Sequence, residues 1–555
     1  MKFAKYLILG AAALAMTSCG NEPGGESTKV PAGSENEEPS KPSDNPGDDV
    51  TSPKPAFTLS NRKVSVNKSE AFQEMEGFGA SDCWLPNTIG QYWSNNRLQL
   101  ARWLFSQNIS SRGEVQGIGL SMWRVNLGAG TAELGDASGI NDDNIGNRAE
   151  SFLEANGAYN WTKCAGQRYF MEQAKNNGVE KFILFSNSPL VQFTLNGQGR
   201  SDNGRYANLK DDCYDDFAEY MAEVAAHFVA EGYNVTHIAP VNEPQYNWEG
   251  NSQEGSGWQN TEVARLAREL DKSLASRNIP TMIELAEAAS WEYLYSNTGN
   301  DGRANVIDAF FNSSSDSYVG DLKHVDKLIA GHSYWTFDNW NGMRDVRTKV
   351  ANAANARGVR VWQTEWSMLD KEPSELGGSY DDVSEFDIAQ YMSRIIHNDI
   401  TKANCSSWSY WTAMSVERWS QKNRFELIKT TPGGGNYSND FTAEGTVQPT
   451  DNLWVLGNYS LFVRPGFRRI GVTHDETKDF FISAYMAPDN SSLVMVVTNY
   501  DKSRGVSLDM ATPEGAKSVY TYTSTADKHL KQERFNLADK VFVDPASVTT
   551  VVYNF

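Results

Sequence analysis

The sequence has little cysteine and little positive charge, and each shortage counts against a class of protein. There are 5 cysteines among 555 residues, with no CxxC pair and no histidine cluster nearby. A zinc site is therefore not expected, and Cys83, Cys164, Cys213 and Cys405 are predicted to be buried thiols. Lysine and arginine total 50 against 70 acidic residues, a net charge of −20. Because an acidic protein repels phosphate backbones, nucleic acid is not an expected partner.

Two further features are missing. No glycine-rich phosphate loop opens a helix after a strand, which argues against a doubly wound nucleotide-binding sheet. The apolar run at residues 6–16 is too short to cross a bilayer as a mature helix.

The N-terminus carries a targeting segment. Two lysines precede the apolar run, and Thr17-Ser18-Cys19 ends it. This pattern resembles a bacterial lipoprotein signal, in which the signal peptide (residues 1–18) is removed and Cys19 becomes a lipidated N-terminus. An ordinary secretory signal with an incidental cysteine is the alternative. Either way the protein leaves the cytoplasm, and a lipidated form is expected on the outer membrane, at the cell surface or facing the periplasm.

Residues 19–56 are rich in proline, glycine, serine and acidic residues. Such a segment cannot bury enough apolar surface to offset the entropy of ordering, so it is predicted to be a disordered tether. A lipid anchor with a long arm suits an enzyme that acts on polymers outside the cell. We expect membrane contact only through this anchor, and we expect a monomer.

Between residues 76 and 455, β-like runs alternate with helical patterns. Residues 217–228 repeat apolar side chains at helical spacing, and Gly232 stands where a C-cap belongs. The β-like runs number eight: residues 76–82, 119–126, 182–187, 235–242, 281–285, 328–334, 359–365 and 406–411. Repeated strand and helix units of this kind predict a (β/α)8 TIM barrel of the α/β class, with its active site at the C-terminal ends of the strands.

Beyond residue 456 the helical patterns stop. Strand patterns follow at residues 480–485, 493–497, 518–522 and 548–553. They predict an all-β sandwich over residues 456–555. Residues 57–75 also have strand patterns, and we expect them to join this sandwich, so that both ends of the chain form a side domain next to the barrel at residues 76–455.

Two of the eight runs end in a glutamate. Asn242-Glu243-Pro244 follows an apolar run, and the strand should end near Glu243 because a proline cannot donate to a sheet ladder. Glu365 ends the seventh run, so the two carboxyls would face each other across the barrel mouth. Glycoside hydrolysis needs a proton for the leaving oxygen and stabilisation of a positive anomeric carbon, which two carboxyls supply. Their separation decides between retention and inversion, and the sequence does not give it.

Four stretches resemble glycoside hydrolase family 30 of clan A. They are EGFGAS at 76–81, LSMWRVN at 120–126, PVNEP at 240–244 and YSLFVRPG at 459–466. Within that family, residues 119–124 and 187–189 are most similar to the endo-β-1,6-galactanase branch.

The resemblance implies Glu243 as acid/base and Glu365 as nucleophile of a retaining double displacement, with no cofactor and no metal. An acid must begin protonated, which burial and a second carboxylate favour. A nucleophile must stay ionised, and Arg124 is the expected cationic neighbour of Glu365. Asn242 is placed to bond the sugar 2-hydroxyl.

Further candidates for substrate binding stand at the same strand ends: Asn187, Trp248, His332, Tyr334, Trp366 and Trp411. Tyr334 and His332 are candidates for orienting Glu365, and the tryptophans are candidates for stacking on sugar rings. Packing is the plainer interpretation for each tryptophan, and a satisfied core histidine for His332. Glu284 and Glu287 are rival carboxylates that line subsites or form ion pairs.

The sequence thus predicts a retaining glycoside hydrolase with a polysaccharide substrate, most specifically an endo-β-1,6-galactanase acting on arabinogalactan-type side chains. Another family 30 activity is the first alternative: β-1,6-glucanase, glucuronoxylanase or exo-β-glycosidase. A non-catalytic glycan-binding surface lipoprotein is the second.

Overall fold

The computed structural model describes residues 50–299, 302–369, 372–418 and 421–555. The predicted signal peptide, Cys19 and most of the predicted tether lie outside these ranges. No helix among the described residues is long and apolar enough to span a membrane. The four cysteines within them are free thiols, and all but Cys213 are buried.

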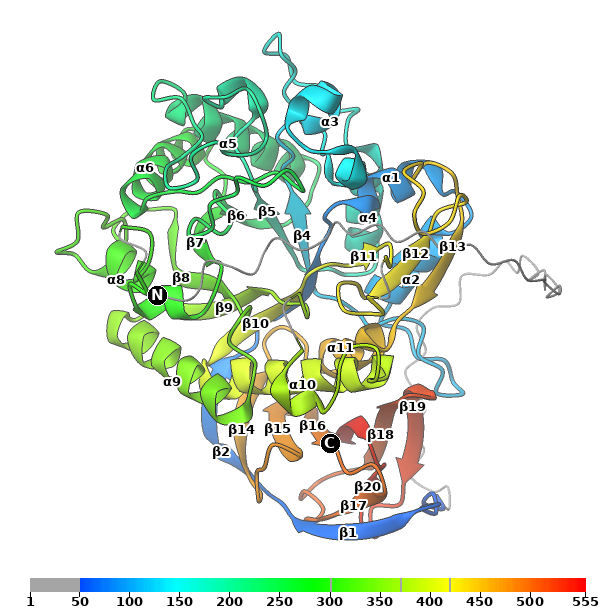
Figure 1. The fold of residues 1–555 in the computed structure, drawn as a ribbon. Coiled ribbons are helices and arrows are strands. Elements are labelled where there is room, and N and C mark those ends of the chain that lie inside the picture. The colour runs from blue at the N-terminus through cyan, green and yellow to red at the C-terminus, as the bar shows by residue number, and fades with distance from the viewer. Residues whose placement is uncertain (1–49, 300–301, 370–371, 419–420) are drawn as a thin grey trace. The chain divides into compact units, whose positions relative to one another are not determined.

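Eight parallel strands close into a barrel (Figure 1). They are β3 (Gly77–Ser81), β4 (Met122–Asn126), β5 (Lys181–Phe185), β6 (Val235–Ala239), β7 (Met282–Ala288), β8 (Val325–His332), β9 (Arg360–Glu365) and β10 (Cys405–Tyr410). Each predicted run overlaps one of these strands. Pairing of β10 with β3 closes the ring, so the TIM barrel prediction is confirmed.

Helices pack around the barrel. They are α1 (Leu85–Tyr92), α2 (Arg97–Phe105), α3 (Thr131–Leu134), α4 (Ala165–Asn176), α5 (Tyr214–Ala230), α6 (Asn260–Arg277), α7 (Glu292–Tyr295), α8 (Val306–Phe311), α9 (Trp340–Arg357) and α10 (Glu385–Lys402). In α5, Phe217, Met221 and Phe228 are buried as the helical spacing predicts. Gly232, with φ 81°, supplies the left-handed residue just beyond that helix.

Both ends of the chain build the side sandwich. Its larger sheet has the order β19-β18-β21-β16-β15-β14-β2, and its smaller sheet the order β1-β17-β20. The strands are β1 (Thr58–Lys63), β2 (Ser65–Glu74), β14 (Arg468–Thr473), β15 (Phe480–Met486), β16 (Ser492–Asn499), β17 (Arg504–Asp509), β18 (Ser518–Thr525), β19 (Lys528–Phe535), β20 (Phe542–Val543) and β21 (Ser547–Asn554). Because β1 pairs with β17 and β2 with β14, the prediction that an N-terminal strand segment joins the sandwich is confirmed.

Two features between the barrel and the sandwich were not predicted from the sequence. A small sheet of β11 (Met414–Ser415), β12 (Ile428–Thr431) and β13 (Thr446–Pro449) follows the last barrel strand. Helix α11 (Asp451–Ser460) then spans the predicted domain boundary at 455/456. Ser460 Oγ donates to the Ile118 carbonyl in the barrel part at 2.5 Å, and Asn458 Nδ2 donates to the Tyr522 carbonyl in β18 at 2.8 Å. The helix is therefore a buried joint between the two parts.

A buried carboxylate fixes the segment that follows β8. Asp399 of α10 and Arg347 of α9 are both fully buried. Asp399 accepts hydrogen bonds from Arg347 Nε at 2.6 Å, Trp291 Nε1 at 3.2 Å, Ser333 Oγ at 2.7 Å and Trp408 Nε1 at 2.9 Å. These bonds join two helices to β10 and to the residue directly after His332.

Replacing Asp399 with alanine should lower the free energy of unfolding by about 3–5 kcal/mol, because Arg347 would stay buried without its partner. Chemical denaturation followed by circular dichroism measures this. Asp345→Ala is the matched control: its carboxylate pairs with Lys349 on α9 at 2.7 Å, and both side chains are more than half exposed. Because solvent screens that exposed pair, its loss should leave the denaturation midpoint close to that of the wild type. Equal midpoints for the two variants would contradict the structural role of Asp399.

Candidate active site

Glu243 stands four residues beyond the end of β6. The strand ends at Ala239, earlier than predicted, because Pro240 has no N–H for the ladder. Glu243 has a left-handed backbone (φ 44°), and its N–H donates to the Glu287 carbonyl at 2.9 Å. Glu365 is the last residue of β9. Both carboxyls are buried.

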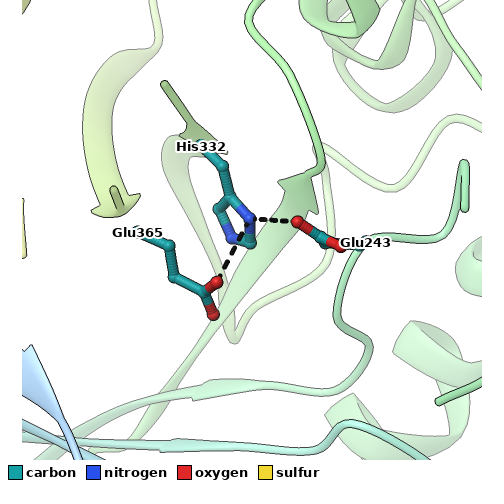
Figure 2. A group of neighbouring side chains, drawn as sticks. All are labelled: Glu243, His332 and Glu365. Atoms are coloured by element: carbon teal, nitrogen blue, oxygen red, sulfur yellow. Dashed lines mark hydrogen bonds and ion pairs between the residues drawn. The ribbon is translucent and has the colours of Figure 1, made fainter. Parts of the chain in front are cut away.

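The two carboxyls lie close together. A carboxylate oxygen of Glu243, one of Glu365 and a ring nitrogen of His332 all lie within 4.8 Å of one another. Figure 2 shows the His332 ring between the two carboxyls, with an interaction to each. Retaining glycosidases have carboxyls about 5–5.5 Å apart, and inverting ones about 6.5–9.5 Å to admit a water. The separation therefore fits retention.

Arg124 of β4 connects the nucleophile candidate to a third carboxylate. Its Nη1 donates to Glu365 Oε1 at 2.5 Å and to Ser81 Oγ at 2.8 Å. Nη2 and Nε donate to Glu287 Oε1 at 2.9 and 3.2 Å, and Nη2 also reaches Asn242 Oδ1 at 3.3 Å. Burial would lower the pKa of Arg124, but the carboxylates of Glu287 and Glu365 outweigh it and raise that pKa. Arg124 is therefore a permanent positive charge in the barrel mouth.

His332 ends β8 with its side chain fully buried. Its Nδ1 lies 2.8 Å from Glu243 Oε1 and 3.5 Å from Glu365 Oε2, and its Nε2 lies 2.9 Å from Glu287 Oε2. Burial would lower the pKa of the ring, but Glu365, Glu243 and Glu287 together raise it to about 10. The ring is thus an imidazolium at neutral pH, with Nε2–H donating to the Glu287 carboxylate and Nδ1–H to a carboxyl oxygen of Glu243.

The sequence left Glu287 of β7 between a subsite and an ion pair, and in the structure it forms a buried ion pair with Arg124. Burial would raise its pKa, but Arg124, His332 and the Thr364 hydroxyl together lower it to about 2. Glu284, which lies earlier on the same strand, has a different protonation state. Both of its carboxyl oxygens are buried, and a neighbouring polar group is the Glu287 carboxylate, to which only a protonated Glu284 can donate. Burial and the neighbouring Glu287 raise its pKa well above the ordinary value, so Glu284 is neutral.

Glu365 has partners on two sides. Besides Arg124, Tyr334 Oη donates to its Oε2 at 3.4 Å. Burial raises the pKa of Glu365 above its ordinary value, and Glu243 and Glu287 add to this, while the positive charges of His332 and Arg124 oppose it without cancelling it. Direct contact with a guanidinium favours the carboxylate form that a nucleophile needs.

Three of the other candidate residues lie near this centre. Trp248, half-buried with φ 53°, donates from Nε1 to the Glu243 carbonyl at 3.2 Å. Trp411 is 9% exposed and meets Trp84 edge to face at 5.3 Å. Asn187 is buried, and its amide donates to Asn126 Oδ1 at 3.1 Å.

Trp366 lies differently. It is 1% exposed, and its ring packs 5.8 Å from Phe337 and 6.3 Å from Trp408. This environment favours packing over stacking on a sugar. Trp335, by contrast, is 42% exposed and lies 5.8 Å from the Tyr334 ring, with a left-handed backbone (φ 58°).

The spacing of Glu243, His332 and Glu365 is also short enough for a metal ion. A metal-bound histidine must offer a neutral nitrogen with a free lone pair. Here both ring nitrogens are occupied by hydrogen bonds to carboxylates, and the raised pKa keeps both protonated. The donor set therefore fits a buried imidazolium rather than a metal centre.

Two buried carboxyls at a retaining separation, carried by strands four and seven of a TIM barrel, define the site of a retaining O-glycoside hydrolase. The chain belongs to O-glycosyl hydrolase family 30, whose family model matches residues 61–423. The family predicted from the sequence motifs is thereby confirmed.

Known relatives cover most of the chain. An endo-β-1,6-galactanase of Hypocrea rufa is 24% identical over 472 residues, which span 82% of this chain and 85% of the relative. The crystal structure of a conserved exported protein from Bacteroides fragilis is 30% identical, with a TM-score of 0.81 over 89% of this chain and 100% of that chain. The catalytic domain of a family 30 xylanase C from Talaromyces cellulolyticus is 19% identical, with a TM-score of 0.63 over 89% of this chain and 100% of that domain.

Proposed function

We propose that the protein is a retaining endo-β-1,6-galactanase that cleaves arabinogalactan-type side chains outside the cell. The pair of carboxyls within 4.8 Å supports the reaction class. The galactanase of Hypocrea rufa, similar over 82% of this chain, supports the substrate. The motif likeness at residues 119–124 and 187–189 points to the same branch.

In the first step Glu365 Oε attacks the anomeric carbon and the bond to the leaving oxygen breaks, while Glu243 gives that oxygen its proton. Arg124 and Tyr334 hold Glu365 in place for the attack. In the second step Glu243 takes a proton from water, the water oxygen bonds to the anomeric carbon, and the bond to Glu365 breaks. Two inversions give net retention. Asn242 lies beside Glu243 to hold the sugar 2-hydroxyl, a contact that strengthens in the transition state.

The two glutamates should respond differently to replacement by glutamine. Glu243→Gln should slow polymer hydrolysis by about 10²–10⁴-fold, because the leaving alkoxide is no longer protonated. On a dinitrophenyl glycoside its first step should survive, because that leaving group needs no proton, and a burst of dinitrophenol should appear. Glu365→Gln should lose both activities.

Glu249→Gln, an exposed position in the same loop as Glu243, is the control and should behave as the wild type. Stopped-flow absorbance and reducing-sugar release measure the three variants. Full polymer activity in Glu243→Gln would show that another group is the acid.

A substrate panel tests the specificity: β-1,6-galactan, β-1,6-glucan, glucuronoxylan and aryl β-glycosides. We expect oligosaccharides from β-1,6-galactan, with the β-anomer appearing first in proton NMR. Preference for glucan or xylan would move the protein to another family 30 activity. Glycan binding without release from any substrate would favour the non-catalytic surface lipoprotein.

We further propose that the protein is exported and anchored to the outer membrane through Cys19. The lysines, apolar run and cysteine within residues 2–19 support this, as does the similarity to a protein described as exported. Cys19→Ala should move the protein from the membrane fraction to the soluble fraction of the cell envelope. Cys213→Ala, at a half-buried thiol far along the chain, should leave it in the membrane fraction. An unchanged distribution of Cys19→Ala would rule out the anchor.

A further inference from the structure

We propose that Glu287 and His332 are positioning residues which hold a fixed positive charge beside Glu243 and Glu365 while the negative charge moves between these two carboxyls. This inference rests on the proposed roles of those two glutamates. Glu287 holds His332 as an imidazolium, and the imidazolium stabilises whichever of the two carboxyls is ionised.

His332 is in contact with carboxyls from three different strand ends. It touches Glu243 at 2.8 Å, Glu287 at 2.9 Å and Glu365 at 3.5 Å, and its side chain is fully buried. Water therefore screens none of these interactions, and a charge on any of the carboxyls is felt strongly by the ring. The ring is thus placed to respond to both catalytic carboxyls at once.

Glu287 makes the imidazolium form the stable one. In a neutral ring one of the two nitrogens has a lone pair and no hydrogen. The carboxyl that faces this nitrogen, Glu243 or Glu287, could keep its hydrogen bond only if it were itself protonated. Glu287 is not protonated, because Arg124 and the Thr364 hydroxyl already donate to it, and its pKa is about 2. Nε2 must therefore keep its hydrogen. Whichever of Glu243 and Glu365 is ionised favours a second hydrogen, on Nδ1.

The charged groups facing the ring then balance. Arg124 from β4 and His332 from β8 are positive, Glu287 from β7 is negative, and Glu284 beside it is neutral. The remaining negative charge belongs to the two catalytic carboxyls, which share it. With one of them ionised and the other neutral, these six groups together carry no net charge.

The reaction preserves this balance. Before the first step Glu365 is ionised and Glu243 carries the proton. Afterwards Glu365 is a neutral ester and Glu243, having protonated the leaving oxygen, is ionised. The negative charge has moved from one neighbour of Nδ1 to the other, across less than 4.8 Å. Because the fixed charges do not change, the low-dielectric site needs little reorganisation in either step.

Glu287→Gln tests the inference. The carboxylate that holds Nε2 protonated is then an uncharged amide, so the pKa of His332 should fall from about 10 toward its ordinary value, about 6.5. The imidazolium is present below that pKa and lost above it. The basic limb of the kcat/KM profile should therefore move to lower pH by at least one unit, with about a tenfold loss at pH 7.5, one unit above that ordinary pKa, and recovery near pH 5.

Two matched variants separate charge from packing. Glu284→Gln changes an equally buried glutamate on the same strand that is already neutral, so the shape of its pH profile should match the wild type whatever its maximal rate. Glu287→Asp keeps the charge and should also keep the wild-type shape. A Glu287→Gln pH profile with the wild-type shape would overturn the inference, whatever the maximal rate of that variant.

The wild-type enzyme gives a second test that no variant can confound by misfolding. With ¹⁵N-labelled histidine, one of the 7 histidine rings should remain protonated on both nitrogens at pH 8.5, and that signal should be lost in Glu287→Gln. If no ring is doubly protonated at that pH in the wild type, the inference is wrong. Inactivity of the wild type on every glycan would count against the proposed function alone, because the ring signal does not depend on turnover.

Discussion

The active site depends on one interaction above all, the contact of the buried Arg124 guanidinium with Glu287. Alone, either charge would be too costly to place inside a barrel, and removing one partner of such a pair typically costs about 3–5 kcal/mol. Together they fix charges from two strands, β4 and β7, and offer further bonds to Glu365 and to His332. The two carboxyls of the active site are thus positioned by a charge network centred on Arg124 and Glu287.

The backbone at this centre is strained in a way that fits the network. Glu243 and Glu287 both have left-handed φ values, 44° and 46°, and the N–H of the first donates to the carbonyl of the second. For residues with a Cβ this conformation costs about 1–2 kcal/mol each. With this backbone conformation, both side chains contact the His332 ring. Packing of the whole barrel holds these residues in place.

Much of this could be predicted from local sequence patterns. The eight strands follow from apolar runs separated by helical spacing, and Glu243 and Glu365 follow from runs that stop at a carboxylate. Glu287 could not be assigned a role in the same way, because its direction depends on an irregularity of β7, where the pairing with β8 shifts between Leu285 and Ala288. A single sequence does not specify such a bulge. Packing was already the plainer interpretation of Trp366, but the neighbours that cover it, such as Trp408, come from distant segments and could not be named from the sequence.

The sandwich joins strands that are far apart in the chain. Thr58 of β1 pairs with Arg504 of β17, and Ser65 of β2 pairs with Thr473 of β14. Chain emerging from its N-terminus presents β1 and β2 first, yet their partners are made only after the entire barrel. The edges of β1 and β2 therefore stay unpaired while the barrel folds. Bringing them to β17 and β14 closes a loop that contains the whole barrel, which is slow. Such edges are open to pairing with other chains in the meantime. The sandwich is thus the last part of the molecule able to form, and its closure pairs the strand edges that were exposed until then.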